Sequence, residues 1–531
     1  MRLNRALGPA IALAAWLVAA DANAALPRAV ARAFLEEGIP LSAVSVYVRE
    51  AGGARPLMSH RPGKPMNPAS TMKLVTTFAA LELLGPDYRW KTEAYAGGPL
   101  VGSTLEGDLV LKGYGDPKIT VEQFQALIAA LRASGLITIR GDLVLDRSYF
   151  ATAAHDPAAF DAEPLKPYNV GPDALLVNFK SVRLVFAPNA AGDATDVRIE
   201  PPLDSVVLHG APRLVVGDCG DWRSALGASF VNRADAADAT FGGRYAASCG
   251  ERDWYVALLD HPHYVLAMFA RYWKEAGGNF AGGVREGRAP DAKPIATLQS
   301  PPLYDAVRDI NKLSNNVMAR QLFLTLATTA HAPPATTAHA AEAVRHWLAK
   351  RKLGFPELVM ENGSGLSRRE RISAQSMARL LLAADASRVR GDFASSLAVA
   401  ATDGTVRKRF IDDDVADQAL LKTGSLEGVR ALAGYVLGPG DRRYVVVCFV
   451  NHRNAGRAQR ALDLLVERVY AGMRDGAWRR AVSRFSTRSR KRASRRRLPG
   501  ASSTVSLAPA GRSSSTMTGS YPKICAPRTG S

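Results

Sequence analysis

The sequence predicts a multidomain α/β protein in which a β-rich module interrupts a region of mixed helices and strands. Patterns typical of helices and of strands alternate over residues 25–90 and 290–475. Residues 91–289, in contrast, hold mainly short strand-like runs between Gly- and Asp-containing turns. The 531 residues are enough for about two to four domains. Hydrophobic residues make up 47% of the chain, which can fill sizeable cores.

The first segment has the pattern of an export signal. Arg2 and Arg5 precede an uncharged apolar run over residues 6–20, and Ala22-Asn23-Ala24 forms a small-x-small cleavage site. We expect residues 1–24 to be a signal peptide that is removed; an uncleaved anchor is the alternative. The apolar run is shorter than the ~20 residues that span a bilayer, and later segments are less suited to span one. The sequence therefore predicts an exported protein.

A strand and a buried helix open the first outer segment. Residues 41–50 alternate, with Val44, Val46 and Val48 on one side, as in a strand. Farther on, Asn67-Pro68-Ala69 precedes Ser70, and an apolar run continues until Gly85-Pro86. This order is typical of a turn that opens a buried helix.

Strands dominate the inserted segment, and helices dominate much of the chain after it. Residues 107–113 and 141–146 are similar strand-like runs around a short helix, and either a weak internal repeat or a simple pair of strands explains their likeness. Further strands are predicted over residues 181–186, 197–200, 205–208, 431–437 and 444–451. Helices are predicted over residues 120–134, 264–275, 303–324, 337–352, 373–384 and 461–472.

The four cysteines fit an exported protein without a metal centre. Cys219 and Cys249 lie in similar Gly-rich surroundings and are the expected disulfide, whereas Cys448 sits in an apolar run and is expected to be a buried thiol. No Cys/His cluster has the spacing of metal ligands, so we expect no metal and no other cofactor.

The net charge of +19 comes mostly from the C-terminus. Between Arg479 and Ser531 there are thirteen Lys/Arg and no acidic residues, so the rest of the chain carries only +6. We expect residues 476–531 to be a basic, disordered tail that could bind an anionic surface. An extension without function is the alternative. The nearly balanced body gives no reason to expect a nucleic-acid partner.

Three short motifs stand in a fixed order in the outer segments: Ser70-Thr71-Met72-Lys73, Ser314-Asn315-Asn316 and Lys422-Thr423-Gly424. Together they supply a nucleophilic hydroxyl, an amine that can take its proton, a second hydroxyl with an amide, and a second cation. These groups suit acyl transfer through a covalent serine ester. Each motif alone also fits a structural alternative: a capped helix start, polar residues on a helix surface, or an ordinary strand end.

Four further strings and the long insertion between the first two motifs point to one family. The strings are Gly113-Tyr114-Gly115-Asp116-Pro117, Tyr168-Asn169-Val170, Asn178-Phe179 and Asn362-Gly363-Ser364-Gly365-Leu366-Ser367-Arg368. In these features the chain resembles the D-alanyl-D-alanine carboxypeptidase/endopeptidases, the class C low-molecular-mass penicillin-binding proteins, over about residues 25–475. The resemblance implies a β-lactamase/transpeptidase-like catalytic domain (residues 25–90 and 290–475) with two small β-rich domains inserted. It also implies a periplasmic enzyme that acts on peptidoglycan stem peptides and is acylated by β-lactams.

The residue types and the resemblance together suggest a role for each residue of the three motifs. Residues three apart share a helix face, so Lys73 can reach Ser70. The helix dipole and the charge of Lys422 should lower the pKa of Lys73, so that its neutral amine can act as general base. Ser314 is expected to relay the proton to the leaving group. Asn316 is expected to bind a substrate carbonyl or to steady Lys73.

Substrate binding is expected from the third motif. Lys422 and Thr423 would hold the terminal carboxylate, and Gly424 would let the strand approach the ligand closely. In this family the oxyanion is held by backbone N–H groups, which here are those of Ser70 and Ser425. Ser364 and Ser367 either contact the substrate or only shape their loop.

Other function classes remain open at this point. A serine β-lactamase, an esterase on the same fold and a penicillin-binding sensor without useful turnover would share the three motifs. A β-lactamase needs a positioned base and water for fast deacylation, and no Glu motif can be assigned to that role. We therefore favour the peptidase. The sequence does not reveal the balance between carboxypeptidase and endopeptidase activity.

Overall fold

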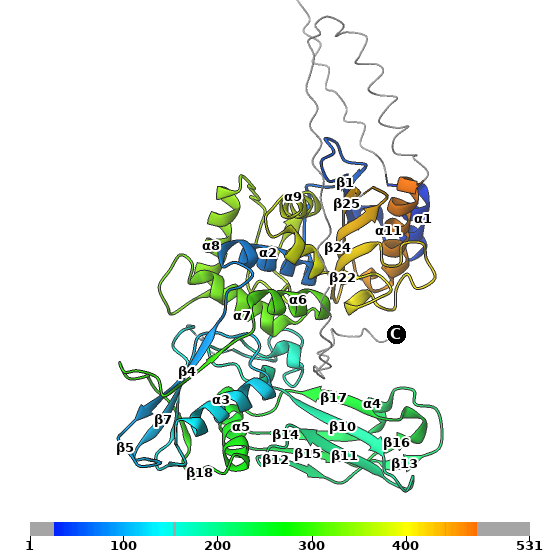
Figure 1. The fold of residues 1–531 in the computed structure, drawn as a ribbon. Coiled ribbons are helices and arrows are strands. Elements are labelled where there is room, and N and C mark those ends of the chain that lie inside the picture. Colours follow the sequence, from blue (N-terminus) through cyan, green and yellow to red (C-terminus); the bar gives the residue numbers. More distant parts are fainter. Residues whose placement is uncertain (1–25, 152–154, 441, 475–531) are drawn as a thin grey trace, which may run out of the picture.

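The computed structural model describes residues 26–151, 155–440 and 442–474 (Figure 1). The expected signal peptide and the expected basic tail lie outside these residues. Within the described ranges, no helix combines the length and the apolar character needed to cross a membrane.

A six-stranded antiparallel sheet joins the two outer segments of the chain. Its strand order is β2-β1-β25-β24-β23-β22, and β1 pairs with β25 from Val44 opposite Val450 to Glu50 opposite Tyr444. The N-terminal and C-terminal segments therefore belong to one folding unit. The strands are β1 (Val44–Glu50), β2 (Met58–His60), β22 (Ala398–Val399), β23 (Ala419–Leu426), β24 (Val429–Gly438) and β25 (Arg442–Asn451).

Helices cover both faces of this sheet (Figure 1). Val446 and Cys448 of β25 belong to the core beneath α1 and α11, whereas Val445, Val447 and Phe449 belong to the core beneath α2 and α9. Because both faces are buried, residues 444–450 of this strand are continuously hydrophobic instead of alternating. The helices are α1 (Arg28–Glu36), α2 (Lys73–Leu83), α6 (Leu303–Leu313), α7 (Asn316–Ala327), α8 (Thr337–Lys350), α9 (Ala374–Asp385), α10 (Arg390–Ser395) and α11 (Gln459–Arg474). A two-stranded pair, β3 (Pro65–Met66) with β21 (Ile372–Ser373), lies outside the large sheet.

The helical run expected over residues 303–324 is interrupted. α6 ends at Leu313 because Ser314 adopts the left-handed conformation with φ 60°. α7 then begins at Asn316, since the side chain of Asn315 accepts the backbone N–H of Met318 over 3.0 Å and caps the new helix. The second motif is therefore a break between two helices and not part of a continuous helix surface.

The inserted segment forms two groups of sheets (Figure 1). In the first group β7 and β9 pair in parallel, so the two similar strand-like runs are neighbours. β20 pairs with β4 in the same sheet, although β20 lies beyond residue 289, where the sequence placed the end of the module. This group comprises β4 (Lys91–Gly97), β5 (Leu100–Val101), β6 (Thr104–Leu105), β7 (Asp108–Gly113), α3 (Val121–Ala133), β8 (Thr138–Ile139), β9 (Leu143–Asp146), α5 (His261–Glu275), β18 (Asn279–Phe280), β19 (Val284–Glu286) and β20 (Ala296–Gln299).

The second group holds the disulfide. Cys219 and Cys249 are bonded to each other, which confirms the expected pair, and Cys448 is a buried free thiol of the large sheet. The elements are β10 (Val182–Pro188), β11 (Thr195–Glu200), β12 (Val206–His209), β13 (Arg213–Val215), α4 (Trp222–Ala225), β14 (Ala228–Asn232), β15 (Ala237–Phe241), β16 (Arg244–Ala246) and β17 (Arg252–Val256). Apolar residues of both groups share one core. How many domains the insertion forms stays a prediction.

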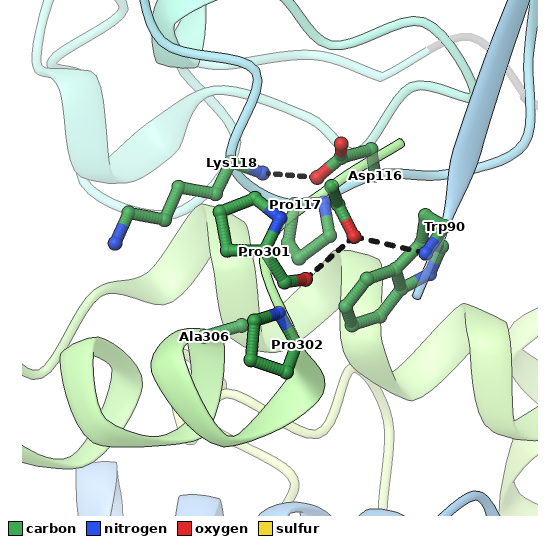
Figure 2. A pocket seen from close by; sticks show the side chains of 8 residues that line it. Trp90, Asp116, Pro117, Lys118, Pro301, Pro302 and Ala306 are labelled. Atoms are coloured by element: carbon green, nitrogen blue, oxygen red, sulfur yellow. Dashed lines mark hydrogen bonds between the residues drawn. The ribbon is translucent and has the colours of Figure 1, made fainter. Parts of the chain in front are cut away.

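The string around Asp116 lies where the insertion meets the catalytic helices. Figure 2 shows a small surface pocket there, lined by Trp90, Asp116, Pro117, Lys118, Ser300, Pro301, Pro302 and Ala306. Asp116 accepts the backbone N–H of Lys118 over 2.9 Å, and burial raises the pKa of Asp116 to about 6. Ser300 accepts the backbone N–H of Trp90 over 2.9 Å. This string thus helps to join the two parts of the chain, and none of the three motifs lines the pocket.

Candidate active site

Ser70 lies in a tight turn just before helix α2. The turn is a 3₁₀ helix over Ala69–Met72, and Ala69 adopts φ 45°, a left-handed conformation that is uncommon for a residue with a side chain. Asn67 stabilises it by accepting the N–H of Ala69 over 2.9 Å, and Asn67 itself is bound on both backbone groups by the side chain of Asn451. The turn leaves Ser70 half-buried while its neighbours are buried.

Two glycines let other segments approach this turn closely. A Cβ at Gly424 would lie 2.8 Å from the carbonyl oxygen of Pro68 and 3.0 Å from the backbone nitrogen of Ser70. A Cβ at Gly365 would collide with the backbone of Ala69, and Gly365 has φ +81°. Strand β23 and the 362–367 loop therefore pack against Ser70 from two directions. The sequence predicts that Gly424 lets its strand approach the ligand closely. In the structure, the close approach at Gly424 is between strand β23 and the Ser70 turn.

Lys73 is buried and points at Ser70. Its Nζ lies 3.1 Å from the Ser70 Oγ, 2.6 Å from the Asn316 Oδ1 and 2.5 Å from the carbonyl oxygen of Ser364. Burial lowers the pKa of Lys73 well below its usual value, and the nearby charge of Lys422 lowers it further. The amine is thus held in one position and made easier to deprotonate.

Lys422 makes a second amine–hydroxyl pair, with Ser314. Its Nζ donates to the Ser314 Oγ over 2.8 Å and to the carbonyl oxygen of Thr423 over 2.9 Å. Burial lowers the pKa of Lys422 to about 7. Ser314 and Thr423 are half-exposed, whereas Lys422 is fully buried beneath them.

One edge of β23 is largely free where these groups lie. In the described part of the chain, β22 pairs with β23 only at Leu420 and Leu421, so the stretch from Lys422 to Leu426 is paired on its β24 side. Ser425 is half-exposed on this stretch. An extended peptide could pair with such an edge.

The structure thus brings the predicted site residues together into one site. Ser70, Lys73 and Asn316 form one group, Ser314, Lys422 and Thr423 form the other, and Gly424 lies against the backbone of Ser70. For the 362–367 loop, the structure favours a shaping role. Ser364 and Ser367 are buried, and their hydroxyls donate to Asn362 over 2.7 Å and to Glu361 over 2.5 Å.

Several functional neighbours escaped the sequence analysis. Thr405 accepts a hydrogen bond from the Thr423 hydroxyl over 2.8 Å. Glu370 and Arg320 are buried charges that act on Lys73. The signal for Thr405 could have been its place after Asp403-Gly404, a turn-forming pair. Glu370 lies in a charged run, Arg368 to Arg371, which is typical of an exposed loop.

The chain is similar to known proteins over most of its length. The model of the D-Ala-D-Ala carboxypeptidase 3 (S13) family matches residues 26–469. The chain is 29% identical to the D-alanyl-D-alanine carboxypeptidase of Actinomadura sp. (strain R39), over 83% of this chain and 84% of that protein. It is 27% identical to D-alanyl-D-alanine carboxypeptidase DacB of Haemophilus influenzae, over 73% of this chain and 81% of the relative.

A solved structure shares the fold. Penicillin binding protein 4 of Haemophilus influenzae superposes with a TM-score of 0.69 at 23% identity, over 83% of this chain and 98% of that one. The expected fold class, an α/β catalytic domain of the β-lactamase/transpeptidase type with β-rich insertions, is confirmed by this match.

Proposed function

The chain belongs to the D-Ala-D-Ala carboxypeptidase 3 (S13) family and is a serine-type D-Ala-D-Ala carboxypeptidase, and from this premise we propose that its reaction runs through an ester on Ser70. The observation that carries the proposal is the position of the Lys73 amine, 3.1 Å from a half-exposed Ser70 hydroxyl. The proposed substrates are the D-Ala-D-Ala ends of peptidoglycan stem peptides.

Lys73 is the proposed general base of acylation. Its neutral amine takes the proton of Ser70 while the serine oxygen attacks the carbonyl carbon of the D-Ala-D-Ala amide. Burial and Lys422 favour the neutral form of Lys73. Asn316 and the Ser364 carbonyl hold the amine beside the hydroxyl, so little reorganisation is needed before attack.

The substrate is proposed to lie extended along the free edge of β23. Lys422 and Thr423 bind its terminal carboxylate, since a buried cation next to a hydroxyl suits that group. The backbone N–H groups of Ser70 and Ser425 hold the oxyanion of the tetrahedral intermediate.

Ser314 is the proposed relay to the leaving group. As the C–N bond breaks, Ser314 gives its proton to the amide nitrogen of the departing D-Ala and is reprotonated by Lys422, to which it is hydrogen-bonded. The proton that Lys73 took from Ser70 then passes to Lys422, so Lys73 is neutral and Lys422 is charged again. Water then attacks the ester carbonyl and gives a proton to the neutral Lys73 amine. Lys73 then gives this proton to the Ser70 oxygen as it leaves, which restores the neutral amine and closes the cycle.

The same site accounts for two further activities that we propose. A β-lactam presents an amide carbonyl and a carboxylate in similar positions, so it acylates Ser70. A cross-link between stem peptides places the same D,D-amide in the cleft, so the enzyme also acts as a D,D-endopeptidase.

Three parallel reactions test the function. The purified protein is given a stem peptide ending in D-Ala-D-Ala, a cross-linked muropeptide and benzylpenicillin in separate reactions. We expect repeated release of D-Ala and slow, near-stoichiometric consumption of penicillin. Rapid, repeated hydrolysis of penicillin without D-Ala release would instead identify a β-lactamase.

We also propose a cellular location and a domain organisation for the enzyme. The signal peptide over residues 1–24 directs it to the periplasm, residues 25–90 and 290–475 form the catalytic domain, and the tail from residue 476 contacts anionic cell-envelope surfaces. An N-terminus at Ala25 in the secreted protein supports export. Truncation after Gly476 is expected to leave the acylation rate unchanged and to weaken binding to anionic vesicles.

A further inference from the structure

Glu370 is a fully buried acid behind the loop that holds Lys73. Its Oε1 accepts the backbone N–H groups of Glu361, Asn362 and Gly363 over distances of 3.1–3.2 Å. Its Oε2 is also buried and makes no hydrogen bond to the described residues. Burying a carboxyl group whose second oxygen has no hydrogen bond costs free energy of folding, so a compensating interaction is required.

The loop that Glu370 organises ends directly at the general base. The Gly363 carbonyl accepts the hydroxyl proton of Thr76 over 2.7 Å, and the Ser364 carbonyl accepts from the Lys73 amine over 2.5 Å. Both Thr76 and Lys73 belong to helix α2. The loop is therefore held between Glu370 on one side and the Ser70 helix on the other.

Glu370 is the acid that faces the charges around Lys73. Burial raises the pKa of Glu370, whereas the three loop N–H groups and the charge of Lys73 lower it and favour its carboxylate form. Within the described residues, Lys422 from β23 and Arg320 from α7 both lower the pKa of Lys73, whereas Glu370 raises it. Glu370 also opposes the lowering of the Arg320 pKa, which burial brings to about 10. Glu361, on the same loop, is partly exposed and is paired with Arg369 over 2.9 Å, so its charge is engaged away from the amine.

We propose that Glu370 is a positioning residue for acylation: its carboxylate holds the 361–364 loop in place and supplies a negative charge that acts on Lys73 and Arg320. The inference rests on the proposed roles of Ser70 and Lys73. It assigns Glu370 two separable effects, one through hydrogen bonds to the loop and one through charge.

Glu370→Gln separates these effects, because the amide oxygen can still accept the three N–H groups. The measurement is the pH profile of the second-order rate of Ser70 acylation by a labelled penicillin, together with kcat/KM for D-Ala release. Without the anion the pKa of Lys73 falls further, so we expect the acid limb of both profiles to move to lower pH. The plateau rate is expected to fall several-fold, since a weaker base removes the Ser70 proton more slowly.

Two further variants control the result. Glu361→Gln removes a charge from the same loop and is expected to leave the acid limb in place. Glu370→Asp keeps the charge while shortening the reach to the loop, so its acid limb is expected near that of the wild type even if its rate and stability fall. Glu370→Asp also serves as the test if Glu370→Gln does not fold.

The outcomes distinguish this inference from the function on which it rests. An acid-limb shift in Glu370→Gln no larger than that in Glu361→Gln overturns the inference. A Glu370→Asp limb that moves to lower pH as far as the Glu370→Gln limb overturns it as well. If Ser70→Ala is still acylated in the same assay, the proposed function fails instead.

Discussion

The Lys422 amine donates to the Ser314 hydroxyl over 2.8 Å, although the two residues are 108 positions apart in the sequence. This bond joins the third motif to the second at the break between α6 and α7. It mirrors the bond between Lys73 and Ser70, so the site holds two buried amines, each behind a half-exposed hydroxyl. The first pair is suited to form the ester, and the second to bind the carboxylate and protonate the leaving group.

Lys422→Ala is expected to lower kcat/KM for D-Ala-D-Ala peptides by about 100-fold or more, because a charge-assisted contact and the relay partner are lost together. Lys408→Ala, which changes an exposed lysine, is the matched control and is expected to retain activity. Thermal unfolding should show both variants folded. A Lys422→Ala enzyme with a nearly normal kcat/KM would contradict the carboxylate-binding role.

The pH dependence of kcat/KM is expected to be bell-shaped. Lys73 must be neutral to act as base, so activity is lost as the pH falls through its lowered pKa. Lys422 must be charged to bind the carboxylate, so activity is lost as the pH rises through a pKa of about 7 in the free enzyme. Lys422→Arg keeps a charge at all accessible pH values and should move the alkaline limb upward. If the alkaline limb stays in place in this variant, a group other than Lys422 causes that limb.

Gly365→Ala is expected to damage the Ser70 turn. The new Cβ would meet the backbone of Ala69, and φ +81° disfavours any side chain, so we expect a loss of about 1–3 kcal/mol in stability and slower acylation. Gly354→Ala places its Cβ in open space and is the control. Denaturant unfolding and penicillin acylation rates measure both effects. Equal behaviour of the two variants would show that the close approach at Gly365 is unimportant.

Loss of the disulfide should affect stability and spare the chemistry. Cys219 and Cys249 close a loop of 30 residues within the insertion, so the double Ser variant is expected to be less stable by about 2–4 kcal/mol. Its acylation rate at moderate temperature should equal that of the wild type, because neither cysteine is in the outer segments that carry the site. A slowed acylation in a folded double variant would reveal coupling between the insertion and the site.

Much of the site could be predicted because its residues lie in short motifs with local structural meaning. The i, i+3 spacing of Ser70 and Lys73 requires only a helical turn, and the structure has one there. The strand that carries Lys422 and the disulfide between the Gly-rich segments are also consequences of local pattern and composition.

The features that escaped prediction depend on contacts between distant segments. The Lys73 amine is held by the Ser364 carbonyl, 291 residues away, in addition to Asn316, whose contact with Lys73 was one of the two expected roles. The helix break at Ser314 carries no Gly or Pro, and the residue is instead bound in its left-handed conformation by Lys422. Glu370 has charged neighbours in sequence, which suggest exposure, yet its carboxyl is enclosed by the loop that it supports.

The central claim, that Ser70 carries the acyl group, is tested most directly by labelling the mature protein with a penicillin and mapping the modified peptide by mass spectrometry. We expect a single adduct on Ser70 that disappears in Ser70→Ala, a variant whose thermal unfolding remains normal. An adduct on another residue, or labelling that persists in Ser70→Ala, would contradict the claim.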